Sequence, residues 1–348
     1  MAPSDWDTLV RQARSADLLA RIGHVLEQGS LLSTMQAGPL GHFNAAAVLA
    51  RAQKEEIFNE VADLMRTLGP LGVPVVLLKG AAYLRAGLPA AAGRTFSDID
   101  ILVPKPALGA VESELMQNGW MTTHHSAYDQ RYYREWMHEL PPMQHIKRGT
   151  VLDVHHGILP ETARSRPDSS KLLSAAIAVN GVPGLFVLAP IDMVLHSMTH
   201  LFHNEEFSHG LRDLSDLDML LRHFGRDAWF WPALVDRARE LNLQRTLYYG
   251  LRHTRAILDT PVPAGTLAAI ASFAPPPALQ AVLDALWSRA LRPQHHTASD
   301  WFSPAALFCL YVRSHWLRMP PMLLVRHLSV KAWRRHRESE PAQERVKV

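Results

Sequence analysis

Residues 79 to 103 read KGAAYLRAGLPAAAGRTFSDIDILV and hold two acidic residues, Asp98 and Asp100, inside an apolar run. On a strand, successive side chains alternate between the two faces. Both carboxylates therefore point the same way, whereas Ile99 and Ile101 point into a core. Two neighbouring carboxylates repel each other unless a cation lies between them. Mg²⁺ binds a few carboxylates and takes further ligands from water and substrate phosphates. The pattern predicts a metal site for phosphate chemistry.

The residues just upstream add groups that bind phosphate. VPVVLLKG, residues 73–80, reads as a buried strand that ends at Gly80. AAYLRAG, which follows, reads as a short helix that ends at Gly87. A helix N-terminus presents free backbone N–H groups to an anion. Lys79 lies at that turn, and Arg94 precedes the acidic strand, so groups for phosphate flank the carboxylates for a metal.

Together these residues carry a family resemblance. Lys-Gly, then an Arg, then Ser-Asp-Ile-Asp in an apolar strand resembles the polymerase-β-like nucleotidyltransferase superfamily. Within it, the chain is similar to a bacterial nucleotidyltransferase family with the pattern LKG…R…DIDILV. The resemblance covers residues 73–160 well, and LRDLSDLDMLL at residues 211–221 is a looser echo. It implies a small catalytic sheet beside a helical domain, with Mg²⁺, or alternatively Mn²⁺, as the metal and an NTP such as ATP as co-substrate.

The superfamily pattern also implies a third acidic residue on a later strand. We predict Asp153, in TVLDVHHGIL, with Arg148-Gly149 as the hairpin turn before its strand. Glu139 is the alternative third carboxylate. His155 shares the predicted face of Asp153, where it either lies near the metal or is a half-exposed strand residue.

The resemblance implies a role for each site residue. Asp98, Asp100 and Asp153 hold the metal, and Asp153 also binds the metal that activates the acceptor hydroxyl or acts as its general base. The nucleotide contacts the remaining predicted residues, which are Lys79, Gly80, Arg94, Ser97, His155 and Arg212.

Each assignment has a plainer alternative. Asp98 and Asp100 also fit the solvent-facing edge of a half-exposed strand. Arg94 fits a structural salt bridge, and Ser97 fits a cap of the strand.

The helix predicted at residues 211–221 has its own pair of interpretations. Arg212 and Asp216 are four residues apart and are expected to pair. The helix is either a surface helix with ion pairs or a helix in which Asp216 positions Arg212 toward a substrate phosphate.

Three histidines, His196, His200 and His203, follow a helical spacing on one face. That spacing can ligate zinc, although the Glu of an HExxH site is missing. Ordinary packing and contact with a substrate are the alternatives.

Composition and length set the broad class. The chain has 348 residues, 47% hydrophobic and 20% charged, which is typical of a soluble protein with two or three core units. It has no apolar stretch of the length that a membrane span needs, and its acidic N-terminus is unlike a signal peptide. The single cysteine, Cys309, lies in the apolar run AALFCLYV and is predicted to be buried, which suits the cytoplasm.

The charge of the chain gives little indication that it binds nucleic acid. The net charge is only +3, and the densest basic run is KAWRRHR at residues 331–337. We interpret it as a solvated helix end; contact with RNA or another anionic surface is the alternative.

The predicted fold is α+β (mixed), with a small sheet core between helical segments. Ser4 is the predicted cap of the first helix, and GPLGHF at 38–43 the break before the second. Pro190 is predicted to open the first helix of the C-terminal part. The predicted divisions are an N-terminal helical segment (1–70), a catalytic core (71–188), a C-terminal helical domain (189–338) and a disordered tail (339–348).

The sequence therefore predicts a cytoplasmic, bacterial, Mg²⁺-dependent nucleotidyltransferase. It moves a nucleoside monophosphate from an NTP to a hydroxyl of a protein, peptide, sugar, metabolite or RNA, among which the sequence does not choose. Ala81 and Ala82 stand where many superfamily members have a phosphate-binding Ser, and Lys79 stands where many have Gly. The missing Ser supports the rival prediction of a non-catalytic nucleotide-binding or scaffold protein, whereas Lys79 is shared with the similar bacterial family.

Overall fold

One mixed sheet carries the acidic strand. The computed structural model describes residues 2–123, 130, 133–134 and 136–319. These described residues form a seven-stranded sheet in the order β3-β4-β5-β2-β1-β7-β6. The strands are β1 (Val75–Leu77), β2 (Asp98–Leu102), β3 (Trp120–Thr122), β4 (Met143–His145), β5 (Val151–His155), β6 (Ile177–Ala178) and β7 (Leu185–Val187).

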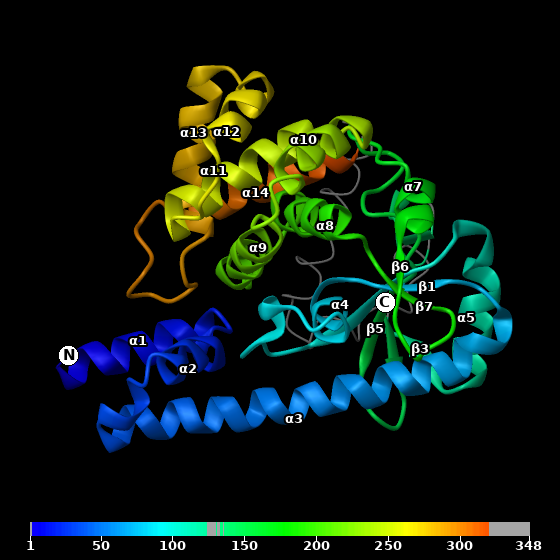
Figure 1. Ribbon diagram of the computed structural model, residues 1–348, viewed down its shortest axis with the longest axis horizontal. Helices are drawn as coiled ribbons and strands as arrows, with labels where there is room; N and C mark the ends of the chain where they lie inside the picture. Colours follow the sequence, from blue (N-terminus) through cyan, green and yellow to red (C-terminus); the bar gives the residue numbers. More distant parts are fainter. Residues whose placement is uncertain (1, 124–129, 131–132, 135, 320–348) are drawn as a thin grey trace, which may run out of the picture.

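Helices precede, interrupt and follow the sheet, and α3 lies on the opposite side of the molecule from α8 and α9 (Figure 1). Among the described residues before 189, the α-helices with assigned bounds are α1 (Pro3–Ser15), α2 (Leu19–Gln28), α3 (Ala37–Leu68), α4 (Lys79–Arg85), α5 (Leu108–Gln117) and α7 (Ser169–Ala175). Those after it are α8 (Pro190–His203), α9 (Gly210–Phe224), α10 (Phe230–Glu240), α11 (Gln244–Leu258), α12 (Ala264–Ile270), α13 (Pro277–Ala290) and α14 (Ser303–Arg318). The predicted α+β class is confirmed.

The acidic strand lies between two partners in the middle of the sheet. β2 runs antiparallel to β1 and parallel to β5. Ile99 and Ile101 are fully buried, in one core cluster with Ile57 and Val61 of α3. Because side chains alternate along a strand, the carboxylates of β2 emerge from the opposite face. The predicted alternation of this strand is therefore confirmed.

The N-terminal helices differ from the prediction at two points. α1 begins at Pro3 after the cap residue Ala2, so Ser4 is not the cap. α3 begins at Ala37 and runs through GPLGHF, so the predicted break at 38–43 is wrong. Pro39 falls in the first turn of α3, where its missing N–H has no helical partner to lose.

The C-terminal part confirms one prediction and corrects another. Pro190 is the first residue of α8, as predicted. Cys309 is exposed, not buried. The buried residues of α14 include Ala306, Leu310 and Ser314, which recur every four positions, and Cys309 falls outside that stripe. The basic run at 331–337 and the predicted tail at 339–348 lie outside the described residues.

In the described part of the chain, no one helix combines the length and the apolar character that a membrane crossing requires. The segments Ala264–Phe273 and Pro277–Ala290 meet the length and composition test only as a bent pair.

Candidate active site

Three carboxylates converge on one face of the sheet. β2 and β5 are parallel, and their register places Asp100 directly opposite Asp153. Asp98 is two residues from Asp100 and shares its face. One carboxylate oxygen from each of the three residues lies within 4.8 Å of the others. The geometry that a shared cation needs is present, and the role of the three as metal ligands remains a prediction.

Asp153 has the environment of a carboxylate that lacks its partner. Its Oδ1 atom is buried and has no hydrogen bond among the described residues. Burial, followed by the charges of Asp100 and Glu139, raises the pKa of Asp153 to about 7. A buried oxygen without a partner, beside two other carboxylates, costs free energy that a divalent cation offsets. The residues therefore fit Mg²⁺, a hard cation that prefers oxygen ligands.

Lys79 neutralises part of this charge. Its Nζ lies 2.7 Å from Asp100 Oδ1. Burial alone would raise the pKa of Asp100, but Lys79 and His155 together hold it well below its usual range. Lys79 stands at the turn from β1 into α4 with a φ of 46°, a left-handed conformation that costs a non-glycine residue free energy. This bend directs the ammonium group to the carboxylates.

Gly80 makes room for an arginine. A Cβ atom at this position would overlap the guanidinium of Arg94. Arg94 Nε donates to Asp216 Oδ2 at 2.9 Å, and its Nη1 donates to the Thr95 carbonyl at 3.1 Å. Arg21 reaches the other oxygen of Asp216, with its Nη1 2.7 Å from Oδ1. In this structure Arg94 therefore forms a buried salt bridge, which was the alternative to its predicted contact with the nucleotide.

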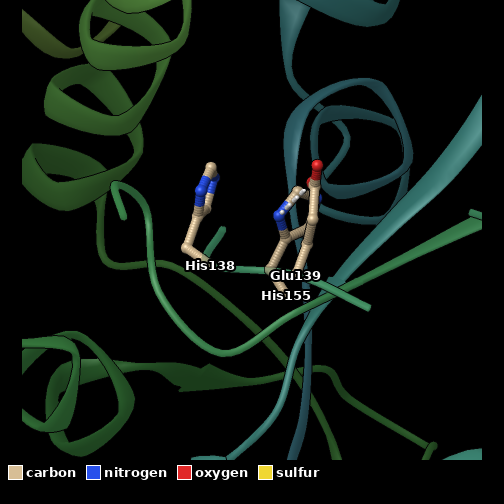
Figure 2. A group of neighbouring side chains, drawn as sticks. All are labelled: His138, Glu139 and His155. Carbon is tan, nitrogen blue, oxygen red and sulfur yellow. Dashed lines mark ion pairs between the residues drawn. The ribbon is translucent and has the colours of Figure 1, made fainter. Parts of the chain in front are cut away.

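His155 links two acidic residues. Its Nε2 lies 3.1 Å from Asp100 Oδ1, and its Nδ1 lies 3.1 Å from Glu139 Oε2. Burial would lower the pKa of His155, but the bond to Asp100 and the charge of Glu139 raise it. Figure 2 shows Glu139 and His155 beside each other, with the ring of His138 nearby. His155 is buried, so the half-exposed alternative is wrong. Glu139, the alternative third carboxylate, lies across this imidazole from Asp100.

The histidines of α8 divide between two environments. Burial and then the positive charge of Lys79 lower the pKa of both His196 and His200. The Nδ1 atom of His200 lies 3.6 Å from Asp213 Oδ2 on α9. Burial and then Arg313 lower the pKa of His203 to about 3, and His203 lines a separate cavity of about 820 Å³. Among the described residues, these three do not form a group with metal-binding distances.

Two further predicted residues contact acidic neighbours. Ser97 is exposed, and its hydroxyl donates to Asp98 Oδ1 at 2.9 Å. Arg212 does not pair with Asp216 as predicted. Its Nε donates to Asp213 Oδ1 at 3.1 Å, and its Nη1 lies 3.5 Å from Asp17 Oδ2.

Helix α9 is also more buried than its charges indicate. Arg212 is 8% exposed and Asp216 is 2% exposed, so the alternative of a surface helix is wrong. Arg21 of α2 and Arg94 of the loop before β2 both pair with Asp216. Arg212 instead pairs with its neighbour Asp213.

Sequence reasoning missed two residues near the site. Arg21 lies on α2, and its sequence neighbourhood contains nothing that distinguishes it from other helix arginines. His138 precedes Glu139 in the sequence, and the pair HE was the available signal. Arg21 and His138 are brought to their positions by contacts between segments that are distant in sequence, which a local sequence pattern does not show.

The solution structure of the antibiotic-resistance factor ANT(2'')-Ia aligns with a TM-score of 0.36 and 12% identity, over 59% of this chain and 98% of that chain. No curated protein matches the chain.

The family is established by a longer match. The sequence model of the family described as uncharacterised nucleotidyltransferase matches residues 2–259. This match spans most of the chain, including the sheet, the carboxylates and helix α9. The chain therefore belongs to the uncharacterised nucleotidyltransferase family, and it is a nucleotidyltransferase.

Proposed function

We propose that this nucleotidyltransferase is Mg²⁺-dependent and transfers a nucleoside monophosphate from an NTP to a hydroxyl group, as the polymerase-β-like resemblance implies. The observation that carries the proposal is the buried, unpartnered oxygen of Asp153, which faces Asp100 across two parallel strands. In this proposal Asp98, Asp100 and Asp153 hold the metal, and Mn²⁺ is the alternative ion. When bound, the metal supplies positive charge to the phosphates and lowers the pKa of the acceptor hydroxyl.

The reaction balances with the groups of this chain. The acceptor oxygen forms a bond to the α-phosphorus, and the bond from that phosphorus to the pyrophosphate oxygen breaks. The hydroxyl proton passes to Asp153 as the general base, because its carboxylate lies beside Asp98 and Asp100 at the proposed metal site. His155 holds Asp100 in place through its Nε2, 3.1 Å away.

The residues that were predicted to contact the nucleotide have different roles in this proposal. Lys79 has an exposed fraction of 17% and lies beside Asp100, so it can neutralise charge on the departing phosphates. Ser97, exposed and bonded to Asp98, is the second group available to a phosphate. Arg94 and Gly80 act by position, because the guanidinium packs over Gly80 and ties the loop before β2 to α9. Arg212, paired with Asp213, stands farther from the phosphates in this proposal.

The test is direct transfer. Purified protein is incubated with each labelled NTP and Mg²⁺, with and without cell extract, and labelled product and pyrophosphate are measured. Asp98→Asn and Asp100→Asn should each reduce transfer by about 100-fold or more, because each removes a metal ligand. Asp236→Asn is the matched control, since Asp236 forms an exposed ion pair with Arg239 on α10. Transfer that survives both site variants contradicts the proposal.

A second candidate, a non-catalytic nucleotide-binding protein, is favoured by one observation. Ala81 and Ala82 are both buried after the turn and supply no hydroxyl for a phosphate. Nucleotide binding that requires Asp98 and Asp100, together with no transfer to any component of the extract, would support this candidate.

A further inference from the structure

A second group of metal-ligand side chains lies beyond His155. His138, Glu139 and His155 each offer one ligand atom, and the three atoms lie within 4.8 Å of one another (Figure 2). Backbone contacts hold the segment that carries the first two against β5. Glu139 forms an antiparallel bridge with His155, and the His156 N–H donates to the His138 carbonyl at 2.8 Å. The donors are therefore anchored on the sheet rather than on a free loop.

The orientation of His155 is the one that a metal-binding histidine adopts. Its Nε2 faces the Asp100 carboxylate at 3.1 Å, which leaves Nδ1 directed at Glu139. A histidine that binds a metal through one ring nitrogen commonly donates its other N–H to a carboxylate. The separation of 3.1 Å between His155 Nδ1 and Glu139 Oε2 is close to the spacing of about 3.4 Å between two donors on a tetrahedral zinc ion.

His138 supplies an independent observation. Its Nδ1 atom is buried and has no hydrogen-bond partner among the described residues. Its ring lies 5.4 Å from that of His155, centroid to centroid, and the two planes differ by 31°. A buried ring nitrogen without a partner costs free energy, and a cation bound through this nitrogen would offset that cost.

The donor types select the class of ion. Two imidazole nitrogens and one carboxylate suit Zn²⁺, whereas Mg²⁺ prefers oxygen ligands alone. We propose that His138, Glu139 and His155 bind one zinc-class divalent ion, at a site separate from the three aspartates. Three protein ligands leave a coordination position open. His155 would bind the ion through Nδ1 and donate its Nε2–H to Asp100. The two metal sites would then be connected by the contact between His155 and Asp100, but they would have no ligand in common.

Cobalt binding tests the proposal without use of activity. The full-length protein is stripped with a chelator, placed in excess Mg²⁺ to fill the oxygen-ligand site, and titrated with Co²⁺. The visible absorption of Co²⁺ reports imidazole coordination of low symmetry, and added Zn²⁺ should displace it. We expect one high-affinity ion per chain, with the affinity reduced by about 10-fold or more in His138→Ala and in Glu139→Gln.

Two controls bracket the result. His156→Ala removes the neighbouring histidine, which follows the end of β5 and is not one of the three clustered side chains, and should leave the Co²⁺ spectrum unchanged. Asp98→Asn should also leave it unchanged while it abolishes nucleotidyl transfer, so failure of this proposal and failure of the proposed function are distinguishable.

Two outcomes would overturn the inference. One is wild-type protein that binds no Co²⁺ in the presence of Mg²⁺, because the cluster is then an ordinary hydrogen-bonded group. The other is binding that persists equally in His138→Ala and Glu139→Gln, which assigns the ion to other histidines. Circular dichroism checks that each variant is folded, and Glu139→Gln preserves the side-chain shape if His138→Ala does not fold.

Discussion

Asp100 and Asp153 face each other on adjacent strands but have opposite environments. Asp100 is paired with Lys79 and His155, which hold its pKa well below the usual range. Asp153 has a buried oxygen without a partner, and burial raises its pKa to about 7. At neutral pH, Asp100 is therefore ionised, whereas Asp153 is about half protonated. Such a separation of two neighbouring carboxyl groups is typical of sites that both bind and exchange protons.

This difference predicts a pH-dependent affinity for Mg²⁺. Below about pH 7 the Asp153 carboxyl is protonated, so the ion must displace a proton in order to bind. The affinity should fall as pH decreases through this range, by up to about tenfold per unit, and should level off above it. Isothermal titration with Mg²⁺ between pH 5.5 and 8.5 measures this. Asp153→Asn should bind weakly at every pH, and a wild-type affinity that is flat with pH is the opposing result.

Gly80 predicts a specific steric effect. In Gly80→Ala, the new Cβ overlaps the buried Arg94 guanidinium, which must move away from Asp216. We expect a loss of about 1–3 kcal/mol in the free energy of unfolding, measured in urea. Gly109→Ala on α5 is the matched control, because its Cβ meets no atom within 4 Å. It should be neutral or stabilise by up to about 1 kcal/mol. Equal effects of the two substitutions would refute the packing role of Gly80.

Helices α2 and α9 and the loop before β2 meet at one carboxylate. Asp216 of α9 receives Arg21 from α2 and Arg94 from the loop, and all three side chains are buried. Arg21 Nη2 also donates to the Ala90 carbonyl at 2.5 Å. The contact therefore sets the position of the loop that leads into the acidic strand.

Loss of this carboxylate should destabilise the fold strongly. Asp216→Asn leaves two buried guanidinium groups without their counter-charge, which costs about 3–5 kcal/mol. Asp236→Asn, which breaks an exposed pair on α10, should cost less than about 1 kcal/mol. Urea unfolding measures both free energies. A small effect of Asp216→Asn would mean that water or a backbone carbonyl satisfies both arginines.

Local patterns predicted part of this arrangement. The strand alternation of Asp98 to Ile101, the helix start at Pro190 and the turn at Gly149 depend on neighbours in sequence, and the structure has all three. The partner of Arg94 could not be predicted, because Asp216 is 122 residues away. The break at residues 38–43 was wrong because Gly and Pro are also tolerated in a first helical turn.

The described residues form one large core and one small one. The large cluster contains buried residues from Ile57 on α3 to Leu310 on α14 and includes the sheet. The small cluster contains Val10, Ala13, Leu19 and Phe43, from α1, α2 and the start of α3. The division of the chain at residues 70/71 and 188/189 remains our proposal. The apolar faces of α1 and α2 are buried in the small cluster, separate from the sheet.

Helices α1 and α2 should therefore open more easily than the sheet. A small core stabilises less than a large one, and Arg21 is a buried ionic link from α2 to Asp216. In hydrogen exchange followed by mass spectrometry, we expect amides of α1 and α2 to exchange faster than those of β2 and β5. Arg21→Ala should increase exchange in α2 by about tenfold or more, equivalent to about 1.4 kcal/mol, and leave β5 unchanged.

Arg11 provides the matched control for this experiment. It lies on α1, and its salt bridge to Asp7 has both side chains 61% exposed, so Arg11→Ala should change exchange little. If Arg21→Ala instead accelerates exchange in β5 as much as in α2, the two cores open together, because a link that served only the small core would leave the sheet protected. If neither helix responds, the ion pair contributes nothing to docking, and α2 is held by the small apolar cluster alone.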